Sequence, residues 1–315
     1  MRILMVGAGG VGAYYGSVLL RAGEDVTFVA RGANLAALRE RGIQVQSVLG
    51  DFTVPSVHTT DDPRPLGPMD LVIFCVKAYD TETAARLVRD NVGPDTAVVS
   101  LQNGVEKEEQ LQRILGEEPV MGGLTLLFST LVEPGHIVHR GGPRSLIFGE
   151  MDGRDSPRGR RIEATLRNAG IPAQLSLNVR TAIWDKFMTI CGTSGTTCLT
   201  RLSIDEIMAC PASRSLLEGL LREVHALARA VGVDLPADAV DARLAYLDTL
   251  DKGARTSMYH DLAAGRRLEL EFIHGTAVRL GQHFRPSSAT LTATFGALFV
   301  LLATQMMLVP GEHHG

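Results

Sequence analysis

The sequence is poor in cysteine and has no surplus of positive charge. Its 315 residues include four cysteines, and none of them lies in a CxxC pair or in a Cys/His spacing typical of a metal site. We therefore expect a reduced, cytoplasmic protein without a bound metal. Lysine and arginine number 31 against 35 aspartates and glutamates, which gives a formal charge of −4. Because nucleic-acid binding requires a basic surface, that class of partner is not expected.

We also expect no targeting signal. The first residues, MRILMV, run directly into a glycine turn, without the apolar length or cleavage site of a signal peptide. One uncharged stretch, residues 286–311, contains a strongly apolar part at 295–309. A membrane span needs about 20 apolar residues, and Thr304 and Gln305 interrupt this one. We expect a buried terminal helix, within one chain or at the face of a homodimer, with a membrane anchor as the alternative.

Apolar runs alternate with helical patterns in the first half of the chain. The runs predict strands at 2–6, 25–30, 70–76 and 96–101, and the patterns between them predict helices at 11–20, 33–41 and 81–91. Such alternation is typical of a parallel sheet with helices on both faces. The fold class expected is therefore α/β, with an N-terminal Rossmann-type doubly wound sheet.

The second half has a different character. Residues 122–150 predict antiparallel strands around a Glu133-Pro134-Gly135 turn, and 153–170 and 171–175 predict a surface helix and a last strand. After residue 178 only helical patterns remain, at 179–193, 213–231, 237–250 and 269–280. A length of about 150 residues per domain suggests two domains. We expect a Rossmann domain at 1–176, an all-helical C-terminal domain at 177–309 and a tail at 310–315.

The turn after the first strand reads GAGGVG and predicts a dinucleotide site. It matches G-x-G-x-x-G through Gly7, Gly9 and Gly12, and Gly10 lies within it. The first glycine permits the sharp turn, the second lets the backbone approach a pyrophosphate, and the third lets the helix pack on the strand. The helix N-terminus attracts the phosphates. We predict that all four glycines contact the cofactor.

Residues at three further strand ends refine this prediction. An NAD enzyme places a carboxylate after the second strand, whereas this sequence has Ala30 and Arg31. A guanidinium suits the 2′-phosphate of NADP(H), although Arg31 as a solvated loop cation is the alternative. Lys77 and Asn103 follow two other strands, and ligands bind beyond such strand ends. We expect both to contact cofactor or substrate.

Lys186 is a candidate general acid in the helical half. Its neighbours one turn away include Ala182, Ile183 and Ile190, which are small or apolar, so the ammonium is expected to be partly desolvated. A lysine in such a setting can donate a proton near neutral pH. The alternative is an ordinary surface lysine whose stem covers apolar residues.

Five ordered motifs resemble the ketopantoate reductase (2-dehydropantoate 2-reductase) family. They are GAGGVG at 7–12, CVKAYD at 75–80, LQNGV at 101–105, NVRTAIWDKF at 178–187 and TSMYHDLAAGRRLELEFIHG at 256–275. The resemblance implies an NADP-binding Rossmann domain, a helical substrate and dimerisation domain, and NADPH-dependent reduction of a 2-oxo acid in pantothenate and coenzyme A biosynthesis.

The resemblance also implies roles for single residues. Lys186 is the proton donor, and Glu269 orients the cofactor or a substrate hydroxyl. Ser257 contacts the substrate, and Asn103 and Lys77 lie at the cofactor, with Asn103 reaching the substrate as well. From its sequence position, Ser257 also suits the N-cap of a helix, with Asp261 as a structural partner of Arg266 or Arg267.

The sequence departs from the family at three substrate positions. Family members that act on ketopantoate carry asparagines one and two turns after the lysine, where this chain has Ile190 and Ser194. A further asparagine is replaced by His274. We expect Ile190 and Ser194 to contact the substrate, and these changes keep open a relative that reduces a different, more apolar 2-oxo acid. A non-catalytic NADP(H)-binding regulator is the remaining alternative.

Overall fold

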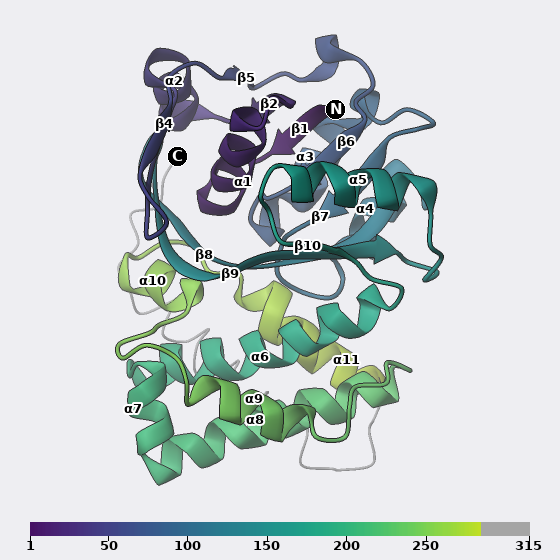
Figure 1. Ribbon diagram of the computed structural model, residues 1–315. Coiled ribbons are helices and arrows are strands. Elements are labelled where there is room, and N and C mark those ends of the chain that lie inside the picture. Colours follow the sequence, from purple (N-terminus) through teal and green to yellow (C-terminus); the bar gives the residue numbers. More distant parts are fainter. Residues whose placement is uncertain (285–315) are drawn as a thin grey trace. The chain divides into compact units, whose positions relative to one another are not determined.

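A computed structural model describes residues 1–284 of the chain (Figure 1). The chain divides into two compact units, Met1–Arg180 and a second that begins at Thr181. Within residues 1–284, no helix is long and apolar enough to cross a membrane. The predicted terminal helix at 295–309 lies outside the described residues.

One mixed sheet of ten strands forms the framework of the first unit. Its strands are β1 (Arg2–Val6), β2 (Asp25–Val29), β3 (Ile43–Ser47), β4 (Phe52–Val54), β5 (His58–Thr60), β6 (Leu71–Phe74), β7 (Ala97–Ser100), β8 (Val120–Glu133), β9 (His136–Glu150) and β10 (Ala173–Leu175). Their order is β4-β3-β9-β8-β7-β6-β1-β2-β5, and β10 pairs with β9. The strands from β8 to β5 along this path pair in parallel. This confirms the predicted Rossmann-type sheet.

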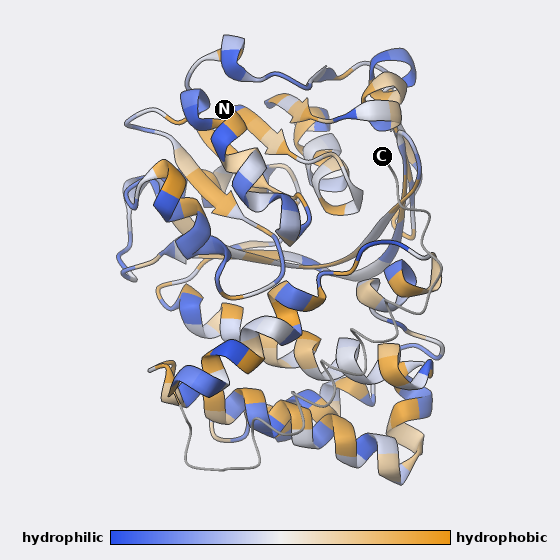
Figure 2. Ribbon diagram, turned by 180° about the vertical axis from the view of Figure 1, so that it is seen from behind, coloured by the Kyte–Doolittle hydropathy of each residue, from blue (hydrophilic) through white to orange (hydrophobic). Residues whose placement is uncertain are grey.

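Five helices of the first unit pack against this sheet. They are α1 (Gly10–Arg21), α2 (Gly32–Arg41), α3 (Thr81–Leu87), α4 (Lys107–Leu115) and α5 (Pro157–Asn168). Alternate side chains of β1 enter separate cores: Ile3 and Met5 join the core that includes α1, α2 and α5, whereas Leu4 and Val6 join the core of α3 and α4. The apolar strands stand out in Figure 2. Burial on both faces explains why β1 reads as a continuous apolar run.

The antiparallel pair β8 and β9 forms a long hairpin, as the sequence predicts. Gly135 in its turn has a φ of +77°, which glycine adopts without strain. Both strands curve past α1 and pack against it (Figure 1). On its far side β9 pairs in parallel with β3, which pairs with β4.

The strands β3, β4 and β5 were not anticipated from the sequence. Ile43 and Val45 of β3 are buried while Gln44 between them is exposed, a half-buried pattern too short to identify by itself. The pairing of β3 with β9 completes the strand. Helix α4 was also missed, because its sequence KEEQLQRIL has few apolar positions.

The second unit is helical throughout its described part, residues 181–284, which confirms the expected fold class. Its elements are α6 (Val179–Thr200), which begins at the end of the first unit, α7 (Ile204–Ala209), α8 (Pro211–Ala230), α9 (Ala239–Leu247), α10 (Ser257–Ala263), a π-helical turn (Glu271–Gly275) and α11 (Thr276–Phe284). Pro211 occupies the first turn of α8, where its missing N–H costs nothing. Ser203 and Glu206 form a capping box on α7. The helix predicted at 269–280 is divided, since the π-helical turn precedes α11.

Candidate active site

The turn after β1 has the close packing that a dinucleotide-binding glycine motif needs. Gly7 has a φ of +104°. A β-carbon on Gly12 would lie 2.0 Å from the Gly7 carbonyl oxygen, so only glycine lets α1 start this close to the strand. A β-carbon on Gly9 would meet no atom of residues 1–284 within 4 Å. The backbone of Gly9 can therefore be approached closely from that side.

Helix α1 presents its N-terminus at this turn. Gly9 is the N-cap, and no side chain of the described residues hydrogen-bonds there. The first turn of α1 contains no acidic residue. The initial N–H groups of a helix and its dipole attract anions. Together with the space at Gly9, this arrangement is compatible with a pyrophosphate group.

Gly10 lies on the opposite side of the turn, against β8. A β-carbon on Gly10 would lie 2.4 Å from the Ser129 carbonyl oxygen. The Ser129 hydroxyl donates a hydrogen bond of 2.9 Å to the carbonyl of Gly10. The side of Gly10 where a side chain would stand is thus filled by β8, so a cofactor would have to approach its backbone from elsewhere.

Arg31 follows β2 and pairs with an acidic residue that the sequence interpretation did not single out. Its Nη2 lies 3.1 Å from Oδ2 of Asp80, which comes shortly after β6. Strands β2 and β6 are the two neighbours of β1. The ion pair therefore joins strand ends on both sides of the glycine turn. The Arg31 side chain is 65% exposed and that of Asp80 32%, so ligands can reach the guanidinium.

Lys77 and Asn103 also lie at this edge of the sheet. Lys77 follows β6, Asn103 follows β7, and both are half-buried. Strands β7, β6, β1 and β2 are consecutive neighbours. The structure thus brings Arg31, the glycine turn, Lys77 and Asn103 to one edge, beyond the carboxyl ends of parallel strands, where ligands of such sheets bind.

Lys186 lies near the start of α6 and is half-buried. The residues on either side of it are anchored. Asp185 pairs with Arg243 of α9, and Phe187 packs edge-on against Trp184 with ring centroids 5.5 Å apart. These contacts fix the rotation of α6 about its axis, and with it the direction in which the Lys186 side chain projects from the helix.

Glu269 and Ser257 have contrasting settings in the second unit. Glu269 is only 7% exposed and lies just before the π-helical turn. Ser257 is exposed on the first turn of α10. The N-cap of α10 is Thr256, whose hydroxyl accepts a hydrogen bond from the Tyr259 N–H, so the assignment of Ser257 as N-cap was wrong. Thr256 also bonds the Thr197 hydroxyl of α6 at 2.9 Å, which ties α10 to the lysine's helix.

The predicted partnership of Asp261 is confirmed for one of its two candidates. Arg266 Nε donates a hydrogen bond of 2.9 Å to Asp261 Oδ1. The Arg266 backbone N–H also bonds the Asp261 carbonyl oxygen at 2.8 Å. Asp261 therefore holds the end of α10, which is a structural role.

Ile190 and Ser194 follow Lys186 on α6 at intervals of one turn. Ile190 is half-buried and Ser194 is buried. The Ser194 hydroxyl donates a hydrogen bond to the carbonyl oxygen of Ile190. Thr193 makes the same type of bond to Thr189, a habit of hydroxyl residues within helices. In this arrangement Ser194 can accept a hydrogen bond but has no proton left to donate.

His274 links the π-helical turn to the middle of α6. Its Nε2 lies 3.0 Å from the Cys191 carbonyl oxygen and donates to it, because a carbonyl can only accept. The ring is fully buried, and burial lowers the pKa of His274 to about 4. His274 is therefore neutral at pH 7 and acts as a structural hydrogen-bond donor to the helix that carries Lys186.

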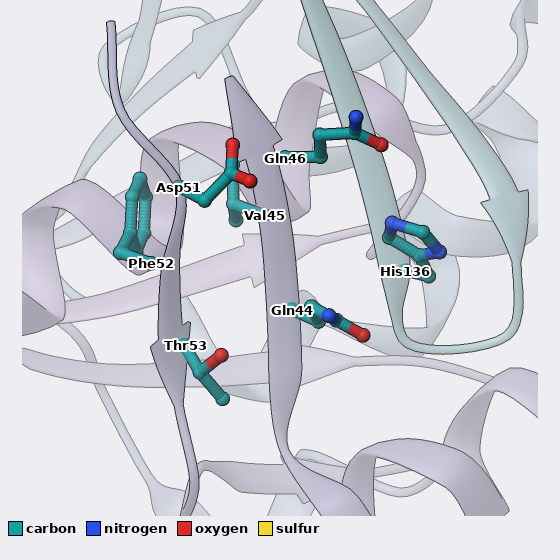
Figure 3. A pocket seen from close by; sticks show the side chains of 7 residues that line it. All are labelled: Gln44, Val45, Gln46, Asp51, Phe52, Thr53 and His136. Carbon is teal, nitrogen blue, oxygen red and sulfur yellow. The ribbon is translucent and has the colours of Figure 1, made fainter.

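A groove with a volume of about 240 Å³ lies elsewhere on the first unit, at the β3–β4 edge of the sheet (Figure 3). Its lining residues come from β3, β4, the residue before β4 and the start of β9: Gln44, Val45, Gln46, Asp51, Phe52, Thr53 and His136. None of the predicted site residues lines it. The groove is consequently not part of the candidate active site.

Comparison with known proteins identifies the family. The model of the ketopantoate reductase PanE/ApbA family matches residues 3–153, and the model of its C-terminal domain matches residues 178–299. The 2-dehydropantoate 2-reductase of Archaeoglobus fulgidus is 32% identical over 284 residues, 90% of this chain and 92% of that protein. The one from Nostoc is 31% identical over 288 residues, 88% of each chain.

Solved structures agree with this result. The crystal structure of 2-dehydropantoate 2-reductase from Geobacter metallireducens has a TM-score of 0.89 and 33% identity, and the match covers 96% of this chain and 99% of that one. A D-mandelate dehydrogenase solved with NADH and anilino(oxo)acetate shares the fold, with a TM-score of 0.87 at 21% identity over 98% and 99% of the chains. The relatives that are 31–33% identical favour an enzyme over a non-catalytic regulator. The chain belongs to the ketopantoate reductase family, whose members are NADP-dependent oxidoreductases acting on a C=O or CH–OH group.

Proposed function

We propose that this protein reduces a small 2-oxo acid to the 2-hydroxy acid with NADPH, and that ketopantoate is the substrate and pantoate the product. The observation that carries this proposal is the shared sheet edge, where four neighbouring strand ends hold the glycine turn, Arg31, Lys77 and Asn103. Relatives named 2-dehydropantoate 2-reductase support the choice of substrate. The reaction would serve pantothenate and coenzyme A biosynthesis.

The first unit has groups that match the charges of NADPH. The N-terminus of α1 and the space at Gly9 suit the pyrophosphate. The exposed guanidinium of Arg31 suits the 2′-phosphate, and Ala30 leaves no carboxylate where an NAD enzyme would have one. A cofactor laid from Arg31 across β1 then continues toward Lys77 and Asn103. When bound, NADPH supplies the hydride.

We assign the proton transfer and the orientation of the substrate to side chains of the second unit. The carbonyl carbon of the substrate gains the hydride and its oxygen becomes negative. The Lys186 ammonium stabilises that oxygen and transfers a proton to it, which gives the hydroxyl group. The Glu269 carboxylate accepts a hydrogen bond from a hydroxyl of the substrate or cofactor and orients it. The exposed Ser257 hydroxyl contacts the substrate.

An NADPH-oxidation assay tests the proposal. Purified protein is given ketopantoate, 2-oxoisovalerate, which lacks the hydroxymethyl group of ketopantoate, and phenylglyoxylate, which has an aromatic side chain. We expect the highest kcat/KM with ketopantoate. Turnover of none of these acids by protein that still binds NADPH would contradict the proposed substrate class.

A second candidate is an acid with a more apolar side chain, and one contact favours it. The Ile190 side chain cannot form a hydrogen bond, and the Ser194 hydroxyl already donates its hydrogen bond to the Ile190 carbonyl oxygen. A site that bonds a substrate hydroxyl discriminates strongly against acids without one, and loss of such groups removes that discrimination. A higher kcat/KM for 2-oxoisovalerate or phenylglyoxylate than for ketopantoate would establish this alternative.

We also propose that the enzyme works in the cytoplasm as a homodimer formed through its helical domain. This assembly rests on the apolar run at 295–309, which lies beyond the described residues. Sedimentation of the full chain distinguishes a dimer from a monomer.

A further inference from the structure

A chain of buried side-chain hydrogen bonds connects the ends of β6 and β7. The Ser100 hydroxyl, at the end of β7, donates to Gln102 Oε1 at 3.0 Å. Gln102 Nε2 donates to the Thr81 hydroxyl at 2.7 Å. That hydroxyl donates to the carbonyl oxygen of Ala78 at 2.7 Å. Ser100, Gln102 and Thr81 are all buried.

These bonds continue a connection that the sheet begins. The ladder between β6 and β7 reaches the Leu101 N–H, which donates to the Phe74 carbonyl at 2.9 Å. Beyond this bond the two segments of the chain leave the sheet, and a hydrogen bond between the side chains of Gln102 and Thr81 connects them. Ala78 follows Lys77 directly, and Gln102 directly precedes Asn103. The relay therefore fixes the backbone beside Lys77 and the backbone beside Asn103 relative to each other.

The direction of each bond is determined by the chemistry of the groups. The Gln102 amide oxygen can only accept and its nitrogen can only donate, while the Thr81 hydroxyl does both. An apolar residue at either position would leave a buried partner unsatisfied, which costs more than the bond itself contributes. Fully satisfied polar networks of this kind hold a single geometry.

We propose that Gln102 and Thr81 are positioning residues for the nicotinamide half of NADPH. The inference rests on the proposed cofactor roles of Lys77 and Asn103. The 2′-phosphate is assigned to Arg31 after β2 and the pyrophosphate to the turn after β1, so the rest of the cofactor extends over β6 and β7. The relay holds the two loops that receive this half. It reaches the adenosine half only through Asp80, which precedes Thr81 and pairs with the exposed Arg31.

Comparing two ligands distinguishes the contributions of the two halves of the site to binding. NADPH engages both, whereas 2′-phospho-ADP-ribose lacks the nicotinamide ring. Thr81→Val and Gln102→Met each remove the relay with little change in volume. We expect the Kd for NADPH to rise about tenfold, because the loops that carry Lys77 and Asn103 lose the bonds that fix them, and the Kd for 2′-phospho-ADP-ribose to change less than about twofold. Thr81→Ser keeps a hydroxyl and should restore NADPH binding.

Thr96 provides a matched control, because it joins the opposite ends of the same two strands. It is buried, accepts a hydrogen bond from the Gly93 N–H at 2.9 Å, and donates to the Met69 carbonyl at 2.6 Å. Thr96→Val should lower stability as Thr81→Val does, with the NADPH Kd unchanged. The positioning role would be overturned if Thr81→Val raised the Kd values of both ligands equally, or if it left the Kd for NADPH unchanged.

The binding assay needs no 2-oxo acid, so its result tests the relay independently of the proposed reaction. If the unaltered protein binds 2′-phospho-ADP-ribose as tightly as NADPH, the nicotinamide half makes no contact and the proposed roles of Lys77 and Asn103 fail with the relay. If NADPH binds more tightly and the relay variants do not change this, only the relay fails. Should Gln102→Met not fold, the Thr81→Val and Thr81→Ser pair decides the question.

Discussion

Gly12 packs so closely on Gly7 that a β-carbon there would lie 2.0 Å from the Gly7 carbonyl oxygen. A β-carbon on Gly9, between them, would meet no atom of residues 1–284 within 4 Å. Two glycines of one motif thus have different physical reasons for being glycine. Gly12 lets the helix dock on the strand, whereas Gly9 leaves room for a ligand.

This contrast predicts that one alanine substitution lowers the stability of the protein and that the other lowers its affinity for NADPH. Gly12→Ala forces apart two backbone segments, which should cost about 1–3 kcal/mol and lower the Tm of the protein without cofactor. Gly9→Ala should leave that Tm nearly unchanged, because the added methyl group meets no described atom, but should raise the NADPH Kd at least about tenfold by occupying the pyrophosphate position. Normal NADPH binding by Gly9→Ala would place the pyrophosphate elsewhere.

The Arg31–Asp80 pair predicts that one acidic residue weakens NADPH binding. Asp80 neutralises the guanidinium that the 2′-phosphate would use. Because exposed pairs contribute about 0.2–1 kcal/mol, Asp80→Asn should tighten NADPH and 2′,5′-ADP by up to about fivefold at low salt. NADH and 5′-AMP, which lack the 2′-phosphate, serve as controls, and their Kd values should not change. Arg31→Asp should abolish the preference for NADPH, and equal Kd values for NADPH and NADH in the unaltered protein would leave Arg31 as a loop cation.

Lys186 is predicted to act on the transition state rather than on the bound cofactor. Lys186→Ala should lower kcat by about 10²–10⁴ with the NADPH Kd close to unchanged. Lys186→Arg should be nearly as harmful, since a guanidinium does not release its proton near neutral pH. The alkaline limb of the pH profile of kcat should disappear in both. Lys252, exposed in the same unit, is the control for loss of a positive charge, and a normal pH profile in Lys186→Ala would remove the proton-donor role.

The buried His274 predicts that acid destabilises the helical unit. A histidine in the unfolded chain has a pKa near 6.5, whereas burial lowers the pKa of folded His274 to about 4. Between these values the unfolded state binds a proton that the folded state does not. The free energy of unfolding should therefore fall as the pH drops from 6.5 to 4, by at most about 1.4 kcal/mol per pH unit.

Urea unfolding followed by Trp184 fluorescence measures this slope. Trp184 is the only tryptophan of the chain and is buried in the same unit. His274→Gln should remove most of the slope, because the amide can still donate to Cys191 and does not titrate. His225→Gln, at a histidine that contacts Pro236 nearer the surface, should keep it. The same pH dependence in His274→Gln would assign the effect to other groups.

The local sequence determined the parts of this protein that depend on neighbouring residues. GAGGVG between an apolar run and a helical pattern indicated the dinucleotide turn, and the runs before Arg31, Lys77 and Asn103 placed these residues at strand ends. The Glu133-Pro134-Gly135 turn indicated the β8–β9 hairpin. In each case the signal lies within a few residues, because turn geometry and burial on both faces restrict the residue types directly.

Only the tertiary structure decided what depends on partners distant in sequence. Asp80 meets Arg31 across 49 positions, and Ser129 meets Gly10 across 119, with no pattern in either segment to announce the contact. Thr256 rather than Ser257 caps α10 and contacts Thr197 of α6, which neighbouring hydroxyl residues do not distinguish by themselves. His274 is neutral because α6 and the π-helical turn bury it together. Burial and hydrogen bonding are set by what packs against a residue, and that is known only once the chain has folded.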